Sequence, residues 1–528
     1  MKKLILGAAI SAAFFVGAAN AAITLDGAGK PVITPADTYE VYLSGASASV
    51  KFIEQLLTSA AVPAASRVCN PSFPIYKYKD NVSGSDQNAY LCVGNTANPT
   101  LAPLLAGAKQ NLLVYKRSLG GSAQGVNPII ANAAINFLRV DVAANCSAPV
   151  VGGGLSTLTC TYAEGDLALS KNVIPDFGIS DVDPIQFQGV NTPAGFAAVT
   201  PTDLLKLNVK SAAAQVFGVV VNTTLRDALQ QAQFPATSTC NPTNAGYAAD
   251  RESATCQPSL DSAQIASIFA GKMSAWTQLK LGTAGNLYAS TTAPGIKPLN
   301  SRVHICSRVN GSGTKAQFGV KFLNYPCTGS VGTPPKPDTG VLPEAFAQAQ
   351  VHQMSTGGQL AECMSELDSG VNTIGTAFNN TYGARWAIGI QGTENNATNS
   401  SAYRTIRVDG ASPTLANVVN GKYKDWTELT FQTNKTHVFD ADELNIVNEI
   451  IKQAGNPAVM AATNPAALHT WGQSGFLAVP TSFVAPANGV VDLASPVNPL
   501  SHAVSATVSA NACRAPVLYN GTGGLQLN

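Results

Sequence analysis

Hydrophobic and polar positions follow two alternating patterns along this chain. Short apolar runs have the length of buried strands, and they are followed by stretches in which apolar residues recur with helical spacing. The runs predict strands at 41–43, 111–115, 176–180, 215–222, 303–308 and 387–390, and the spaced stretches predict helices at 49–61, 127–138, 262–270 and 441–453. Strands that alternate with helices predict an α/β fold with mostly parallel sheets.

Two stretches interrupt this alternation, and cysteines bound each of them. Residues 69–92 and 146–160 are rich in Gly, Ser, Asn and Pro and lack helical spacing, so we interpret them as insertions. A proline-rich stretch at 328–342 predicts a surface loop. The tail after residue 463 contains a strand-like run at 475–479.

The first 21 residues have the pattern of an export signal. Lys2 and Lys3 begin it, an apolar stretch follows at 4–18, and residues 19–21 form an Ala-Asn-Ala cleavage site. No cysteine lies near this site, which argues against a lipid anchor, and no later apolar run is long enough to span a bilayer. We therefore expect a soluble chain in the periplasm with no transmembrane segment, and secretion or display at the cell surface is the alternative.

The charge of the exported chain is close to zero. Loss of the signal segment removes two of the 32 Lys and Arg, which leaves 30 against 31 Asp and Glu, a net charge of −1. This balance argues against nucleic acid or an anionic membrane as the partner. The remaining length is sufficient for two or three domains with full cores.

Ten cysteines in an exported chain predict disulfide bonds. The spacing of neighbouring cysteines favours the pairs Cys69–Cys92, Cys146–Cys160, Cys240–Cys256, Cys306–Cys327 and Cys363–Cys513. The chain has no C-x-x-C pair, so neither a redox motif nor a zinc motif is expected, and we expect no cofactor.

An anion-binding loop is predicted where the strand at 303–308 ends. Arg308 is followed by Asn-Gly-Ser-Gly-Thr at 310–314 and by a helix that starts near Lys315. A helix start offers free backbone N–H groups and a positive dipole end, and a guanidinium group matches the geometry of tetrahedral oxyanions. These features favour a small oxyanion, phosphate first, that is held without any chemistry being done on it.

Three further loops have the same setting between a strand and a helix, at 44–49, 120–125 and 178–181. Anion sites in α/β folds lie at the carboxyl ends of strands, where helices begin. Taken alone, each loop is more simply a helix N-cap, which contributes about 0.5–2 kcal/mol of stability. Four such loops in one chain favour a binding site.

Asp181 is the residue that predicts a preference for phosphate over sulfate. A carboxylate beside an anion is favourable when the anion carries a proton that the carboxylate accepts in a hydrogen bond, as phosphate does and sulfate does not. The alternative for Asp181 is a turn acid that supports Pro184. The alternative for Arg308 is a surface ion pair, worth about 0–1 kcal/mol.

The order of these motifs resembles that of the PstS-like phosphate-binding proteins of ABC transporters, a branch of the type II periplasmic binding proteins. The matching pieces are LSGASAS (43–49), GGSAQGV (120–126), FGISD (177–181), VFGVVVN (216–222), LDSAQIASIFAGKMSAW (260–276), SRVNGSGTKAQF (307–318), WAIGI (386–390) and VDGASPTLANVVNGKY (408–423).

The resemblance implies two α/β lobes joined by two crossover strands, with the ligand in the cleft between them. Lobe I would comprise 22–213 plus 400–528, and lobe II would comprise 214–399. The ligand-binding residues that the resemblance implies are Ser49, Val50 through its N–H, Ser122, Asp181, Arg308, Ser312, Gly313 and Thr314.

The implied function is that of a periplasmic solute-binding protein, a monomer and not an enzyme, that holds phosphate or a related protonated oxyanion for uptake through an ABC permease. Two alternatives stay open. The chain could be a secreted or cell-surface protein that kept the fold and lost or changed its ligand, or a phosphomonoester hydrolase. Against the hydrolase, the sequence has no G-x-S-x-G, Walker A or H-E-x-x-H motif and no visible grouping of metal ligands.

Overall fold

One large mixed sheet runs through the computed structural model, which describes residues 23–281, 285–328, 348–371, 383–480, 490–503, 509–519 and 525–526. The predicted signal segment and nearly all of the predicted loop at 328–342 lie outside these residues. The strand order of the sheet is β13-β12-β14-β10-β17-β9-β1-β4-β3-β2-β7-β6, and β15 and β20 also pair with β10. Its strands are β1 Thr38–Gly45, β2 Ile75–Asp80, β3 Gln87–Val93, β4 Asn111–Arg117, β6 Val150–Gly152, β7 Leu155–Cys160, β9 Phe177–Ser180, β10 Leu207–Asn222, β12 His304–Arg308, β13 Gln350–Met354, β14 Ala387–Gly392, β15 Tyr403–Thr405, β17 Trp426–Asn434 and β20 Phe476–Ala478.

Parallel pairing occurs in the two parts of the sheet that end in the predicted anion loops. In the first part β1 pairs in parallel with β4 and β9, and in the second part β12 pairs in parallel with β13 and β14. Between them, β10 is antiparallel to β14 and β17, and β17 is antiparallel to β9. The α/β class is therefore confirmed, and the sheet is mixed because the crossing strands and the hairpins pair antiparallel.

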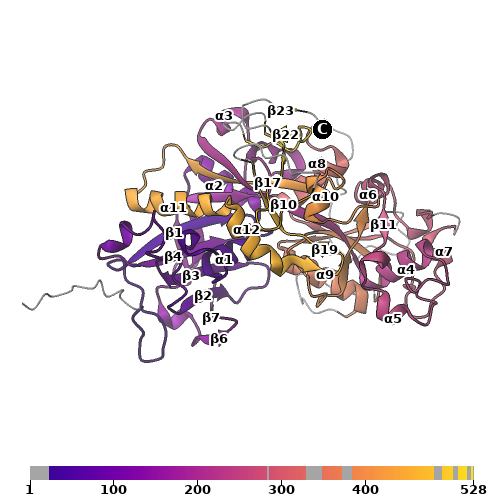
Figure 1. Cartoon of the computed structure of the whole chain (residues 1–528), viewed down its shortest axis with the longest axis horizontal. Coiled ribbons are helices and arrows are strands. Elements are labelled where there is room, and N and C mark those ends of the chain that lie inside the picture. The colour runs from indigo at the N-terminus through magenta and orange to yellow at the C-terminus, as the bar shows by residue number, and fades with distance from the viewer. Residues whose placement is uncertain are drawn as a thin grey trace, which may run out of the picture.

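The strands β10 and β17 pass from one hydrophobic core to the other. Ala213 of β10 and Phe431 of β17 belong to a core around β1, β4 and the helices α1, α11 and α12. Val219 of β10 and Trp426 of β17 belong to a second core around β12 and the helices α4, α6, α8 and α10. Figure 1 shows β10 and β17 between the half that contains β1 to β4 and the half that contains α4 to α7. The lobe boundaries predicted above stay a prediction.

The helices pack against the sheet, and α9 lies on the opposite face of β12 and β14 from α4, α6 and α8. Their bounds are α1 Val50–Thr58, α2 Asn127–Ala131, α3 Pro201–Leu204, α4 Thr223–Gln233, α5 Tyr247–Asp250, α6 Ser262–Phe269, α7 Leu287–Ser290, α8 Gly313–Leu323, α9 Gly357–Ser369, α10 Leu415–Val419, α11 Ala441–Ala454 and α12 Pro457–Thr463. Smaller sheets are formed by β5 Ile135–Leu138, β8 Ser170–Val173, β11 Ser259–Leu260, β16 Arg407–Val408, β18 Leu468–His469, β19 Gly472–Gln473, β21 Leu500–Ser501, β22 Val517–Tyr519 and β23 Leu525–Gln526. Among the described residues, none of the helices has both the length and the apolar composition that a membrane span requires.

The helix predicted at 127–138 is wrong in its second half. Helix α2 ends at Ala131 because Asn132 takes a left-handed backbone conformation with φ of 49°. The residues after it form β5, which pairs antiparallel with β8 and buries Phe137 and Leu138. Apolar residues at 135–138 are thus buried by strand pairing, and a short apolar run does not distinguish this from a helix.

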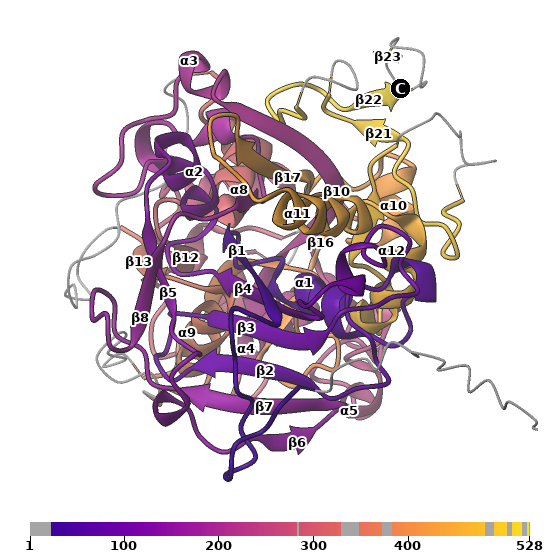
Figure 2. The same cartoon turned by 90° about the vertical axis from the view of Figure 1, so that its left-hand side faces the viewer.

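Both predicted insertions contain strands that extend the main sheet. The hairpin of β2 and β3 lies within 69–92 except for its last residue, Val93, and β7 of the second insertion pairs in parallel with β2. Figure 2 shows β4, β3, β2, β7 and β6 side by side in that order. The insertions therefore widen the half of the molecule that contains β1.

Five disulfide bonds are present, and three of them confirm predicted pairs: Cys69–Cys92, Cys146–Cys160 and Cys240–Cys256. The other two predicted pairs are wrong, because Cys306 pairs with Cys363 and Cys327 pairs with Cys513. Pairing by neighbour spacing fails here because Cys306 on β12 packs against α9, and the segment after α8 meets the C-terminal tail.

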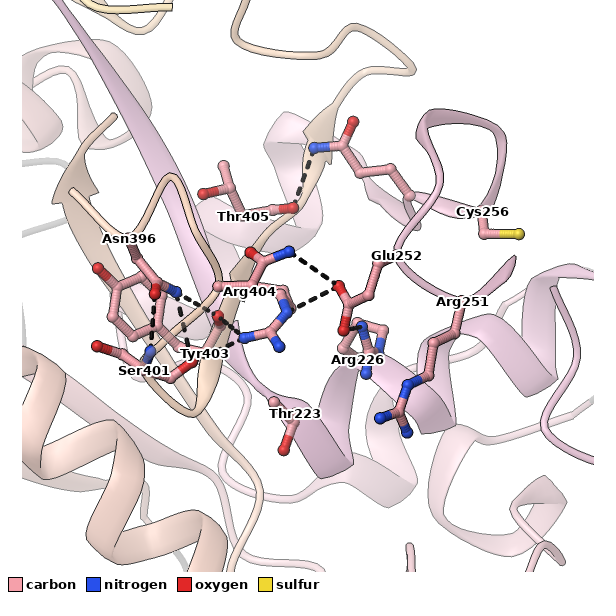
Figure 3. A network of polar contacts seen from close by, with 12 residues as sticks. Thr223, Arg226, Arg251, Glu252, Cys256, Asn396, Ser401, Tyr403, Arg404 and Thr405 are labelled. Atoms are coloured by element: carbon pink, nitrogen blue, oxygen red, sulfur yellow. Dashed lines mark hydrogen bonds and ion pairs between the residues drawn. The ribbon is translucent and has the colours of Figure 1, made fainter. Parts of the chain in front are cut away.

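The segment closed by Cys240–Cys256 is attached to its neighbours by a polar network (Figure 3). Glu252 accepts from Arg226 of α4 at 2.9 Å and from Arg404 of β15 at 2.8 Å. Each oxygen of one carboxylate is thereby used by a different guanidinium group, which fixes this segment against the second core.

Candidate functional site

The loop after β4 contacts the loop after β12, although the two are far apart in the sequence. The Ala123 N–H donates to the Gly311 carbonyl oxygen at 2.9 Å. Gly121 has φ of 72°, and a Cβ at this position would lie 3.0 Å from the same oxygen. Glycine suits this position on both counts, because it adopts positive φ without strain and lets the two backbones approach.

Asp181 follows the last residue of β9 and lies between these two loops. Thr314 Oγ1 donates to Asp181 Oδ2 at 3.2 Å, and the Asp181 N–H donates to Ser122 Oγ at 3.2 Å. A Cβ on Gly313 would lie 2.3 Å from Ser122 Oγ and 2.8 Å from the Asp181 Cβ. The absence of a side chain at Gly313 therefore allows the start of α8 to approach the carboxylate.

Ser312 caps α8, since its Oγ accepts from the Lys315 N–H at 3.3 Å. This is the structural role that a serine before a helix usually has. The hydroxyl hydrogen is not used by the cap and stays available for donation to an anion.

Arg308 is buried, with 1% of its surface exposed, so the alternative of a surface ion pair is wrong. Its Nη2 donates to Ser47 Oγ and to the Ser355 carbonyl oxygen, each at 2.8 Å, and its Nε donates to the Met354 carbonyl oxygen at 3.3 Å. These contacts hold the guanidinium group in one orientation. We call the cluster that it completes the cradle: Ser122, Asp181, Arg308, Ser312, Gly313 and Thr314.

Two polar atoms of the cradle are buried and have no hydrogen-bond partner in the described part of the chain: Asp181 Oδ1 and Arg308 Nη1. An unsatisfied buried polar atom costs about 1–3 kcal/mol, and more when it is charged. One of these atoms accepts and the other donates. An oxyanion with one proton would satisfy both, because its O–H group donates and its other oxygens accept.

Burial shifts the protonation of both groups toward their neutral forms. It raises the pKa of Asp181 to about 6, although the nearby positive charges of Arg308 and Lys116 and the hydrogen bond from Thr314 act in the opposite direction. Burial also lowers the pKa of Arg308 to about 10, and the negative charge of Asp181 opposes this shift. Arg308 therefore stays charged at neutral pH.

Lys116 is a further charged group near the cradle that the sequence analysis missed. Its Nζ donates to the carbonyl oxygens of Gly45 and Ala46 at 2.8 and 3.0 Å, and it holds the loop after β1 in place. Burial lowers the pKa of Lys116 to about 7, and the charges of Asp86 and Asp181 oppose that shift. The only sequence signal is a lysine directly after the apolar run that ends at Tyr115, shortly before a predicted anion loop.

The loop after β1 presents Ser47, which was not among the predicted site residues, to Arg308. Ser49 is buried and its hydroxyl donates to the Ala46 carbonyl oxygen at 3.4 Å, while the Val50 N–H donates to the Ser47 carbonyl oxygen, also at 3.4 Å. Both of these bonds are long and therefore weak. Ligand contacts of Ser49 and Val50 stay a prediction.

The described residues contain no group of three or more His, Cys, Asp or Glu side chains placed to hold a metal ion.

No family model and no curated protein matches this chain. Solved structures that match include one described as a phosphate ABC transporter substrate-binding protein with bound phosphate from Clostridium perfringens, with 12% identity, a TM-score of 0.37, and coverage of 80% of this chain and 98% of that one. An ABC-type phosphate transport receptor from Vibrio cholerae matches with 14% identity, a TM-score of 0.27 and coverage of 52% and 74%. A phosphate-binding protein from Stenotrophomonas maltophilia matches with 11% identity, a TM-score of 0.30 and coverage of 58% and 79%.

Proposed function

We propose that this protein binds phosphate, or another oxyanion that carries a proton, in the cradle. The observation that carries the proposal is the pair of buried, unpartnered atoms Asp181 Oδ1 and Arg308 Nη1. The hydroxyl groups of Ser122 and Ser312 and the start of α8 supply further donors for the remaining oxygens. The hydroxyl hydrogen of Thr314 is already donated to Asp181. We further propose that the protein is an exported, monomeric solute-binding protein that delivers its ligand to an ABC permease. Five disulfide bonds are typical of exported proteins.

The test is isothermal titration calorimetry of the purified protein with phosphate, arsenate, sulfate and molybdate in separate experiments. We expect saturable binding of phosphate and arsenate, which carry a proton near neutral pH, and much weaker binding of sulfate. Absence of binding for both phosphate and arsenate would overturn the proposal. Equal affinity for phosphate and sulfate would overturn the role of Asp181.

Arg308→Gln tests the site within the same assay. A hydrogen bond to a charged group contributes about 1.5–3 kcal/mol, so we expect phosphate affinity to fall about 10- to 150-fold. Arg404→Gln is the matched control, because Arg404 forms its ion pair with Glu252 in another part of the molecule. The site assignment fails if Arg308→Gln and Arg404→Gln bind phosphate equally well.

A further inference from the structure

A cavity of about 420 Å³ adjoins the cradle. It is lined by residues at the start of α1, by the hairpin of β2 and β3, and by the start of α9. Two lining residues stand next to partners of Arg308. Ser47 accepts from Arg308 through its hydroxyl, and Thr356 follows Ser355, whose carbonyl oxygen also accepts from Arg308. Arg308 itself does not line the cavity, so a ligand that extends from the cradle into it would pass Ser47.

The hairpin of the first insertion forms one side of this cavity. Its turn contains Gly84, where a Cβ would lie 2.2 Å from Nε2 of Gln359 on α9. The insertion thus reaches from the half that contains β1 to the helix α9 of the other half. The insertion and α9 therefore form facing walls of the cavity.

The walls of the cavity are polar and have balanced charge. Lys51, Lys79 and Glu362 line it with exposed side chains, and no hydrogen bond or ion pair engages them within the described residues. Lys77, also at the wall, is paired with Glu54. No aromatic side chain is among the lining residues that the structure describes.

We propose that the cavity holds the hydroxyl-rich part of a phosphate ester, such as a hexose phosphate, whose phosphate group lies in the cradle. This inference rests on the proposed function. Small-molecule sites have volumes of about 300–1,000 Å³, and free phosphate in the cradle would leave this cavity unfilled. Hydroxyl groups both donate and accept, which matches a wall of ammonium, carboxylate and amide groups.

The same walls disfavour other substituents. A second phosphate group would need an excess of positive charge, and Lys51 and Lys79 are offset by Glu362, Asp80 and Asp86 at the same cavity. A nucleobase would be expected to stack on an aromatic ring, which the described lining does not offer.

The experiment compares glucose 6-phosphate with inorganic phosphate, glucose and pyrophosphate by calorimetry at pH 6, where about half of a phosphomonoester carries a proton. We expect glucose 6-phosphate to bind at least tenfold more tightly than phosphate, and glucose not to bind at millimolar concentration. The inference alone is overturned if phosphate binds and glucose 6-phosphate binds no more tightly, or if pyrophosphate binds more tightly than glucose 6-phosphate. If neither phosphate nor glucose 6-phosphate binds, the proposed function and this inference both fail.

Gly358→Trp places a large side chain in the cavity from the first turn of α9, where the nearest atom to a new Cβ is Thr356 Oγ1 at 3.6 Å. We expect it to weaken glucose 6-phosphate binding at least tenfold and to leave phosphate binding within twofold, which also shows that the variant is folded. Gly152→Trp is the control, since Gly152 on β6 has no atom within 4 Å of a new Cβ. If Gly358→Trp also loses phosphate binding, Lys79→Ala becomes the deciding variant. For Lys79→Ala we expect the affinity for glucose 6-phosphate to fall at least threefold and the affinity for phosphate to stay unchanged. An unchanged affinity for glucose 6-phosphate in the deciding variant contradicts the inference.

Discussion

Asp181 is the residue on which ligand selectivity depends. In Asp181→Asn the side-chain amide can donate a hydrogen bond to an oxyanion that has no proton, which the carboxylate cannot do. We therefore expect the ratio of phosphate to sulfate affinity to fall at least tenfold in this variant, measured by titration of each anion at neutral pH. An unaltered ratio would show that Asp181 does not select the ligand by accepting a hydrogen bond from its O–H group.

The buried carboxyl group of Asp181 also predicts a pH dependence of stability in the ligand-free protein. Burial raises its pKa from 3.8 to about 6, so the folded protein binds more protons than the unfolded chain between these values. The free energy of unfolding then falls as pH rises from about 4 to about 6, by about 3 kcal/mol for this group. Urea denaturation at pH 4 and pH 7 should show a smaller difference for Asp181→Asn than for the wild type. Equal pH dependence of the two proteins would contradict this assignment.

At the scale of single residues, the sequence predicts the positions of residues that lie directly at the end of a strand. Arg308 and Asp181 could be predicted because each comes at the end of an apolar run. The contact of Ser47 with Arg308 could not, because Gly45 with φ of 112° turns the loop after β1 in a way that spacing does not reveal. Lys116 was missed because its direction depends on the pairing of β4 with β1.

At the scale of elements, the start of α8 must lie close to Ser122 and Asp181. Gly313→Ala would place a Cβ 2.3 Å from Ser122 Oγ, so the helix or the serine must move. We expect overpacking to lower the free energy of unfolding by about 1–3 kcal/mol and to weaken phosphate binding. Chemical denaturation and calorimetry measure the two effects. Gly358→Ala, with its nearest neighbour at 3.6 Å, is the control and should change neither quantity.

The elements that the sequence predicted well are those whose local pattern and tertiary burial agree. Helix α11 is amphipathic and packs in the first core, and it lies within one residue of its predicted bounds. Strand β10 begins at residue 207 and not at 215. The prediction missed the start of the strand because its first residues are partly exposed and form no apolar run. Exposed strand residues are fixed here by pairing with β17, which local sequence does not show.

At the scale of the whole molecule, Cys327–Cys513 ties the segment after α8 to the C-terminal tail across 186 residues of sequence. Cys146–Cys160 closes a separation of only 14 residues. The chain-entropy model predicts that removing the long-range bond, with both cysteines replaced by serine, costs about 2 kcal/mol more than removing the short-range bond. Urea denaturation of the two double variants tests this difference. A larger loss in the Cys146/Cys160 variant would show that native packing, and not chain entropy, dominates.

The continuity of β10 has a consequence for how ligand enters and leaves. Strand β10 is hydrogen-bonded to β17 through residues 207–216 and to β14 through residues 217–221. The two halves are therefore joined here by a paired strand and not by a flexible linker. We expect the two halves to move relative to each other by a twist of this shared strand, which resists the twist elastically. The resistance of β10 to twisting, and not the contacts of the bound anion alone, would then determine the rate at which the ligand dissociates.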